Sequence, residues 1–78
     1  MCGIIGAASS RNVGKLLVQG LHKMEYRGYD SAGIALHQKD SIFNLRTLGK
    51  VKLLEDGMIQ ERPKSKLGIA HTRWATHG

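Results

Sequence analysis

The chain has 78 residues, which limits it to one small domain. It carries 12 lysines and arginines against 6 acidic residues, a formal net charge of +6 with neutral histidines. The cations are scattered without a run of five or more, and the few aromatic residues do not alternate with them as in a base-stacking surface. A small basic nucleic-acid-binding module is therefore the weaker alternative, and it predicts affinity that falls steeply with salt.

The single cysteine excludes an internal disulfide. The cysteine and histidines lack the spacing of a metal site, so neither a metal nor another cofactor is predicted. No segment approaches the roughly 18 apolar residues of a membrane span, and the N-terminus lacks the cationic region of a signal peptide. A free cysteine without such a signal fits a reducing compartment, so we expect a cytoplasmic protein that does not bind membranes.

The first predicted elements are a strand and a helix. Residues 3–8 form a short apolar run typical of a buried strand. Asn12 can cap the helix predicted over residues 12–25. Its core-facing side chains recur at helical spacing: Val13, Leu16, Leu17, Gly20, Leu21 and Met24. The intervening Lys15, Gln19, His22 and Lys23 are expected to face water.

A turn is predicted over residues 27–31, followed by strands over 32–36 and 42–48 that a turn at 38–41 joins into a hairpin. In the second of these strands, Phe43, Leu45 and Thr47 alternate with Asn44 and Arg46, which predicts one wet face. A short helix, weakened by Gly57, is predicted over 51–60. A polar loop (63–66), a last strand (67–72) and an exposed loop (73–78) follow. The mixture of helices with an antiparallel hairpin predicts the α+β class.

Cys2 is the first candidate catalytic residue. Removal of Met1 would make it the N-terminal residue, with its thiol beside an α-amino group of unperturbed pKa near ~7.7–8.0. A nucleophile that carries its own base is a known catalytic arrangement. While Met1 remains, that nitrogen is an amide and cannot act as the base. The alternative is that Cys2 is a small apolar residue at the start of a buried strand.

Two longer motifs add substrate-binding chemistry. Residues 24–33 place Arg27, with its five fixed donors, between two tyrosines in a glycine-rich turn. Residues 67–78 end a strand with Arg73, Trp74, Thr76 and His77. An arginine that can form two parallel bonds to a carboxylate, next to an aromatic plate and short polar groups, is a plausible clamp for an amino acid. Trp74 could equally be a packing anchor, and His71 and His77 ordinary hydrogen-bonded residues.

These motifs resemble a known family. Cys2-Gly3-Ile4-Ile5-Gly6 is similar to the start of class II glutamine amidotransferases, which are N-terminal-nucleophile hydrolases. Residues 25–35, 48–51 and 68–78 resemble the glucosamine-6-phosphate synthase family, also called glutamine–fructose-6-phosphate aminotransferases. The resemblance runs along the whole chain in the right order. It favours this family over the amidophosphoribosyltransferase and asparagine synthetase families, which the opening residues alone would allow.

The resemblance implies the first part of a four-layer αββα sandwich. Cys2 would attack the side-chain amide of L-glutamine, with its own amino group as base and acid. Arg73 would bind the glutamine α-carboxylate, with Thr76 and His77 in the same loop.

The resemblance also assigns two supporting roles. Trp74 would gate the passage of ammonia, and Arg27 with Gly28 would position the N-terminal residue. Fructose 6-phosphate would be the acceptor in a separate synthase part of a homo-oligomeric parent. Residues 1–78 would then be a fragment of the glutaminase domain, inactive alone because its oxyanion donors lie outside it.

Overall fold

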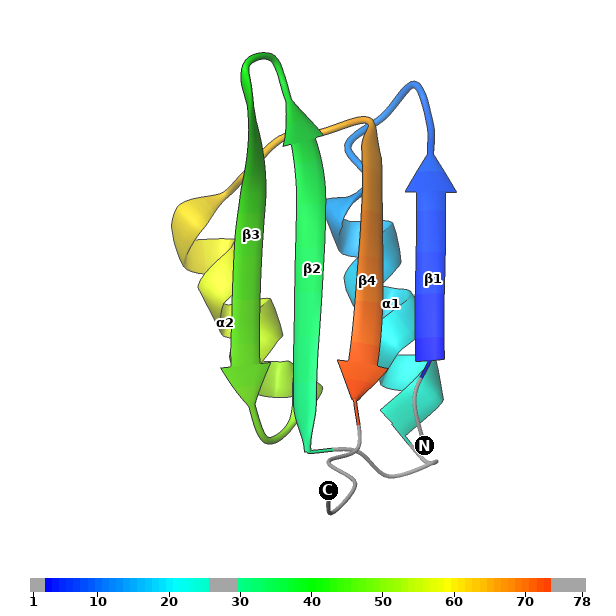
Figure 1. The fold of residues 1–78 in the computed structure, drawn as a ribbon, viewed down its shortest axis with the longest axis vertical. Coiled ribbons are helices and arrows are strands. Elements are labelled where there is room, and N and C mark those ends of the chain that lie inside the picture. The colour runs from blue at the N-terminus through cyan, green and yellow to red at the C-terminus, as the bar shows by residue number, and fades with distance from the viewer. Residues whose placement is uncertain (1–2, 26–29, 74–78) are drawn as a thin grey trace.

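The computed structural model describes residues 3–25 and 30–73. Six elements follow one another along the chain, and Figure 1 shows them: β1 (Gly3–Ala8), α1 (Gly14–Met24), β2 (Ser31–Gln38), β3 (Ser41–Leu48), α2 (Val51–Glu61) and β4 (Leu67–Arg73). The order of strands and helices agrees with the sequence prediction, and the described residues form a mixed structure with an antiparallel sheet. No helix within them is long and apolar enough to cross a membrane.

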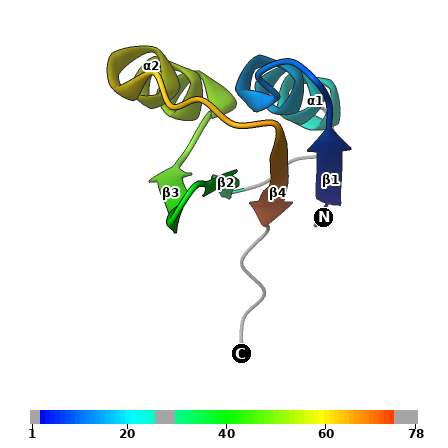
Figure 2. The same ribbon diagram turned by 90° about the horizontal axis from the view of Figure 1, so that it is seen from above.

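The four strands form one antiparallel sheet in the order β1-β4-β2-β3. The last strand along the chain therefore lies between the first and the second. Both helices cover the same face of this sheet, as Figure 2 shows from above. Helix α1 packs on β1 and β4, and α2 packs on β2 and β3.

The core lies between the helices and the sheet. Its members are buried apolar side chains from both layers: Val13, Leu17, Val18, Leu21, Ala32, Ile34, Leu36, Val51, Leu54, Met58 and Ala70. The predicted face of α1 was partly wrong, because Leu16 is 52% exposed whereas Val18 is 4% exposed. The neighbouring α2 explains the difference, since its Met58 lines the same hollow as Val18 and turns the buried stripe of α1 towards α2.

Strands β2, β3 and β4 extend beyond their predicted bounds because of pairing across the sheet, and α2 ends one residue later than predicted, at Glu61. Gln38 pairs with Ser41, which leaves a two-residue turn in the β2–β3 hairpin. Arg73, predicted to begin an exposed loop, instead pairs with Ser31 as the last residue of β4. Gly57, which weakens helix propensity, lies where α2 approaches β3: a Cβ there would be 2.8 Å from Leu45 Cδ2. The glycine thus leaves room for the end of the Leu45 side chain.

The opposite face of the sheet is not covered by any described residue. The predicted first strand is confirmed, with Ile5 and Ala7 packed against the core, whereas Ile4 on its other face is 80% exposed. Ile69 on β4 is 53% exposed on the same face, paired in register with Gly6 and Ala35. On β3 the predicted alternation is confirmed, with Asn44 and Arg46 exposed on this open face.

Candidate functional site

Three strands bring the sequence motifs to one end of the sheet. Gly3 begins β1 and pairs with Thr72, while Ser31 begins β2 and pairs with Arg73. Thr72 therefore has Gly3 on one side and Ala32 on the other. The stretch after Cys2, the stretch after Arg27-Gly28 and the stretch before Trp74 thus converge at the lower end of the sheet in Figure 1.

Backbone hydrogen bonds fix this end. The amide of Asp30 donates to the carbonyl of Arg73 at 2.9 Å, and the amide of Gly49 donates to the carbonyl of Asp30 at 2.9 Å. Gly49 has a φ of 94°, a left-handed conformation that favours glycine. These bonds give the Leu48-Gly49-Lys50-Val51 motif a structural role. Gly49 connects the β3–α2 turn to Asp30, just before β2, and Asp30 in turn connects to Arg73 at the end of β4.

Gly3 lies against the last residue of α1. A Cβ at Gly3 would be 2.7 Å from Met24 Sδ and 3.5 Å from Thr72 Oγ1. Thr72 is buried, and Met24 packs against the core. Gly3 thus has its main chain between β4 and the end of α1.

Arg73 is the only predicted site residue that the structure describes. It is exposed at the end of β4, on the open face of the sheet. Cys2, Arg27, Gly28, Trp74, Thr76 and His77 lie outside the described residues. The structure therefore describes Gly3, Ser31 and Arg73 at the strand ends, and of the predicted site residues it describes Arg73.

The open face also carries a polar row that the sequence prediction missed. His71 and Arg46 flank Gly33 in register, and a Cβ at Gly33 would be 2.5 Å from His71 Nε2 and 2.9 Å from Arg46 Cγ. With Asn44 and Ile69 they line a hollow of about 520 Å³. The period of two that joins Ile69, His71 and Arg73 on β4 is the signal that could have indicated a shared face.

The described residues contain no group of three or more histidine, cysteine, aspartate or glutamate side chains that could hold a metal ion. Among the described residues, Arg73 supplies a cation at this end of the sheet. A guanidinium at an exposed strand end is suited to binding a carboxylate through two parallel hydrogen bonds.

Comparison with known proteins gives a consistent result over the whole chain. The chain is 56% identical over 79 aligned positions to the glutamine–fructose-6-phosphate aminotransferase (isomerizing) of Haemophilus ducreyi. It is 54% identical to that of Vibrio cholerae and 51% identical to that of Acinetobacter baylyi. The chain matches the N-terminal region of these enzymes.

In each of these comparisons the whole chain is covered, but it spans only 13% of the length of the relative. No family model matches the chain. The similarity to these aminotransferases confirms the resemblance predicted from the motifs.

Proposed function

We propose that this chain is the first part of the glutaminase domain of a glutamine–fructose-6-phosphate aminotransferase. Two findings support the proposal together: the similarity to such enzymes along the whole chain, and the meeting of the three motif-bearing strand ends at one end of the sheet. The second carries the chemical argument, because a nucleophile and a carboxylate clamp must act on one small substrate. Gly3 pairs with Thr72 across the sheet, and Arg73 follows Thr72 in the chain. Gly3 and Arg73 are therefore close to each other although 70 positions separate them in the sequence.

The proposed reaction begins with Cys2 as the N-terminal residue. Its α-amino group takes the thiol proton, and the sulfur attacks the side-chain amide carbon of L-glutamine. The carbon–nitrogen bond then breaks, the amino group returns the proton to the departing nitrogen, and ammonia leaves a γ-glutamyl thioester. Water attacks the thioester carbon, the carbon–sulfur bond breaks, and glutamate is released with the thiol restored.

The substrate contacts follow from the same arrangement. Arg73 binds the α-carboxylate of glutamine, with Thr76 and His77 in the loop that follows it. Arg27 and Gly28 position the N-terminal residue, and Trp74 gates the passage of ammonia. In the complete polypeptide, a separate synthase part, present in a homo-oligomer, converts fructose 6-phosphate and this ammonia to glucosamine 6-phosphate.

The open face of the sheet supports the proposal of a larger, αββα domain. Exposed isoleucines at Ile4 and Ile69 and the small residues Gly6 and Ala35 form an apolar surface that suits packing against a second sheet. Residues 1–78 then supply one sheet with its helical layer. Without the second sheet and the oxyanion donors, the chain alone has no useful glutaminase activity.

The test is covalent labelling of the complete polypeptide that contains this chain, after confirmed removal of Met1. The reagent is diazo-oxo-norleucine, an electrophilic analogue of glutamine, and intact mass followed by peptide mapping locates the adduct. We expect one adduct at Cys2 that excess glutamine prevents. A Cys2→Ser variant is the matched control, since it keeps the size of the side chain and removes the thiol.

Two further experiments test the carboxylate clamp and the acceptor separately. In the Arg73→Lys variant, Cys2 should still be labelled, but only at much higher reagent concentration. The reason is that a lysine cannot form two parallel hydrogen bonds to the α-carboxylate. Amination assays with fructose 6-phosphate, phosphoribosyl pyrophosphate and aspartate test the acceptor. No Cys2 adduct would contradict the glutaminase mechanism, and activity with only the latter two acceptors would contradict the assignment to aminotransferases of fructose 6-phosphate.

A further inference from the structure

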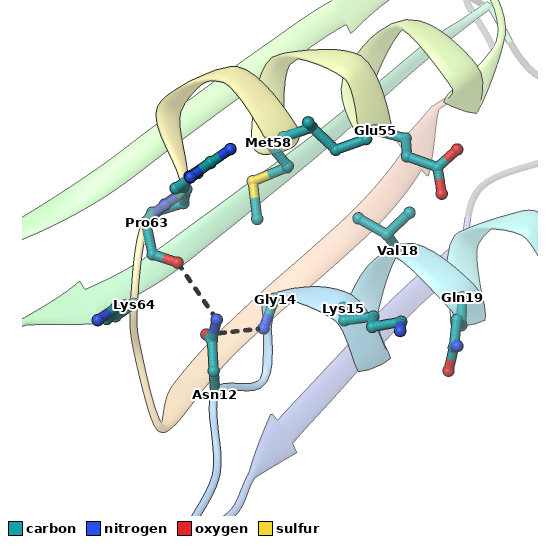
Figure 3. Close-up of a pocket in the computed structure, with 11 residues that line it drawn as sticks. Asn12, Gly14, Lys15, Val18, Gln19, Glu55, Met58, Pro63 and Lys64 are labelled. Carbon is teal, nitrogen blue, oxygen red and sulfur yellow. Dashed lines mark hydrogen bonds between the residues drawn. The ribbon is translucent and has the colours of Figure 1, made fainter.

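A hollow lies between α1 and α2, in the helical layer on the covered side of the sheet and so away from the open face that carries Arg73. Its volume is about 520 Å³, within the range of about 300–1,000 Å³ typical of small-molecule sites. Figure 3 shows Val18 and Met58 facing each other across its middle. Both side chains are buried, and Ile59 adds an exposed apolar wall. The middle of the hollow is therefore apolar.

Asn12 builds one end of the hollow. Its Oδ1 accepts hydrogen bonds from the amides of Gly14 (3.3 Å) and Ser65 (3.1 Å), and its Nδ2 donates to the carbonyl of Pro63 at 3.4 Å. Figure 3 shows the bonds to Gly14 and Pro63. One side chain thus ties the start of α1 to the connection between α2 and β4. These hydrogen bonds connect the two segments at this end of the hollow.

The walls of the hollow carry an excess of positive charge. Lys15, Arg62 and Lys64 line it, and none of them has an acidic partner at ion-pair distance within the described part of the chain. Glu55 is the acidic side chain that lines the hollow, and its Oε1 is 3.5 Å from His22 Nε2. Three cations against one carboxylate favour a ligand with negative charge.

Arg62 occupies this position in a costly conformation. It follows α2 with φ 48° and ψ 48°, the left-handed region, where a helix usually ends in glycine. A non-glycine residue costs roughly 1–2 kcal/mol there. The chain has arginine rather than glycine in this conformation, and Arg62 lines the hollow.

We propose that the hollow between α1 and α2 binds a small anion with an apolar body, a phosphate or carboxylate joined to a hydrophobic group. The apolar part lies between Val18 and Met58, and the anionic group is bound by the cations of the walls. The site is separate from the proposed glutaminase end, so it can be occupied whether or not Cys2 acts as a nucleophile. A result that contradicts anion binding in the hollow would therefore leave the proposed glutaminase function untouched, and the reverse also holds.

The experiment uses the complete polypeptide with ¹³C-labelled methionine methyl groups. The Cε atom of Met58 would be 2.9 Å from a Cβ at Gly14, so its methyl reports on the hollow. Met24, which packs against Gly3, is the matched reporter at the other end of the fold. Met58→Leu and Met24→Leu assign the two signals. The probe is phenyl phosphate, compared with inorganic phosphate and with uncharged benzyl alcohol.

We expect phenyl phosphate to move the Met58 signal saturably at millimolar concentration and to leave Met24 in place. Both comparison compounds should bind more weakly, because each supplies half of the recognition. Arg62→Gly and Lys15→Gln should each raise the dissociation constant about fivefold or more, whereas Lys66→Gln, outside the hollow, should not change it. Arg62→Gly removes backbone strain, so loss of binding in that variant does not reflect loss of the fold.

Three results would overturn the proposal. The first is a Met58 signal that phenyl phosphate does not move. The second is an equal response to benzyl alcohol, which would make the hollow merely apolar. The third is unchanged affinity in both Arg62→Gly and Lys15→Gln, which would mean that the cations do not bind the anion.

Discussion

Gly68→Ala should lower the free energy of opening of the sheet around β4, which lies between β1 and β2. Gly68 is buried on β4, and a Cβ there would be 2.9 Å from the backbone oxygen of Ala35, 2.5 Å from Leu36 Cδ2 and 3.0 Å from Leu17 Cδ1. The leucines are fully buried, and the oxygen belongs to the neighbouring strand, so neither can retreat freely. Overpacking costs about 1–3 kcal/mol, and the contact with a backbone oxygen puts Gly68→Ala in the upper part of that range, at about 2–3 kcal/mol. Stiffening of the unfolded chain returns at most about 1 kcal/mol, which leaves a net loss of about 1–2 kcal/mol.

The assay is hydrogen–deuterium exchange of the complete polypeptide, read from peptides that cover β2 and β4. A loss of about 1–2 kcal/mol in the free energy of opening should speed exchange roughly 5- to 30-fold. Gly57→Ala is the matched control, because its Cβ would be 2.8 Å from Leu45 Cδ2, the flexible end of a half-buried side chain. That leucine can move, and alanine is the better helix former, so exchange in α2 should be nearly unchanged.

The reasoning would be refuted by unchanged exchange in Gly68→Ala. It would also be refuted if Gly57→Ala accelerated exchange to the same extent, because the contact with a backbone oxygen would then carry no special cost.

Three further expectations concern single side chains, each read by urea denaturation. Arg62→Gly should raise stability by about 0.5–1 kcal/mol, because the relief of left-handed strain exceeds the entropy cost of glycine. Ser65→Ala should lower the free energy of unfolding by about 1–2 kcal/mol, because the buried Ser65 hydroxyl donates a hydrogen bond to the carbonyl of His37 at 2.5 Å. Ser9→Ala is the control, because the hydroxyl of Ser9 is exposed and its loss should not change stability. Lys52 Nζ donates a hydrogen bond to Asp56 Oδ1, and this bond raises the pKa of Lys52 above its ordinary value. Any stabilisation is therefore present below the ordinary pKa and lost as the pH rises through the raised pKa. Because the pair is exposed, Asp56→Asn should leave the urea midpoint unchanged between about pH 6 and pH 9.

The order of the elements could be predicted from the sequence because apolar spacing and turn residues act locally. The helical spacing around Leu17 and Leu21 and the alternation along β3 each identified an element and its core face. What local spacing could not predict is the neighbour of each element. Val18 is buried and Leu16 exposed because α2 lies beside α1, a contact between distant parts of the chain.

The site shows the same limit in another form. The motifs identified Arg73 as a candidate carboxylate clamp. Nothing in their spacing indicated that Gly3 pairs with Thr72, or that the backbone amide of Asp30 donates to the backbone carbonyl of Arg73. The sequence placed Arg73 in a loop, whereas pairing with Ser31 makes it part of β4. The polar row of His71 and Arg46 was missed because the two residues meet only across Gly33, through strand pairing.

The position of β1 has a consequence for how the protein is made. Within the described residues β1 pairs only with β4, so its partner is synthesised after all the other described elements. The β2–β3 hairpin can form early, because its strands are neighbours in sequence, whereas β1 must wait until β4 has been made. The N-terminal backbone is thus unpaired while the ribosome is still extending the sequence. An aminopeptidase that removes Met1 therefore has access before the sheet closes.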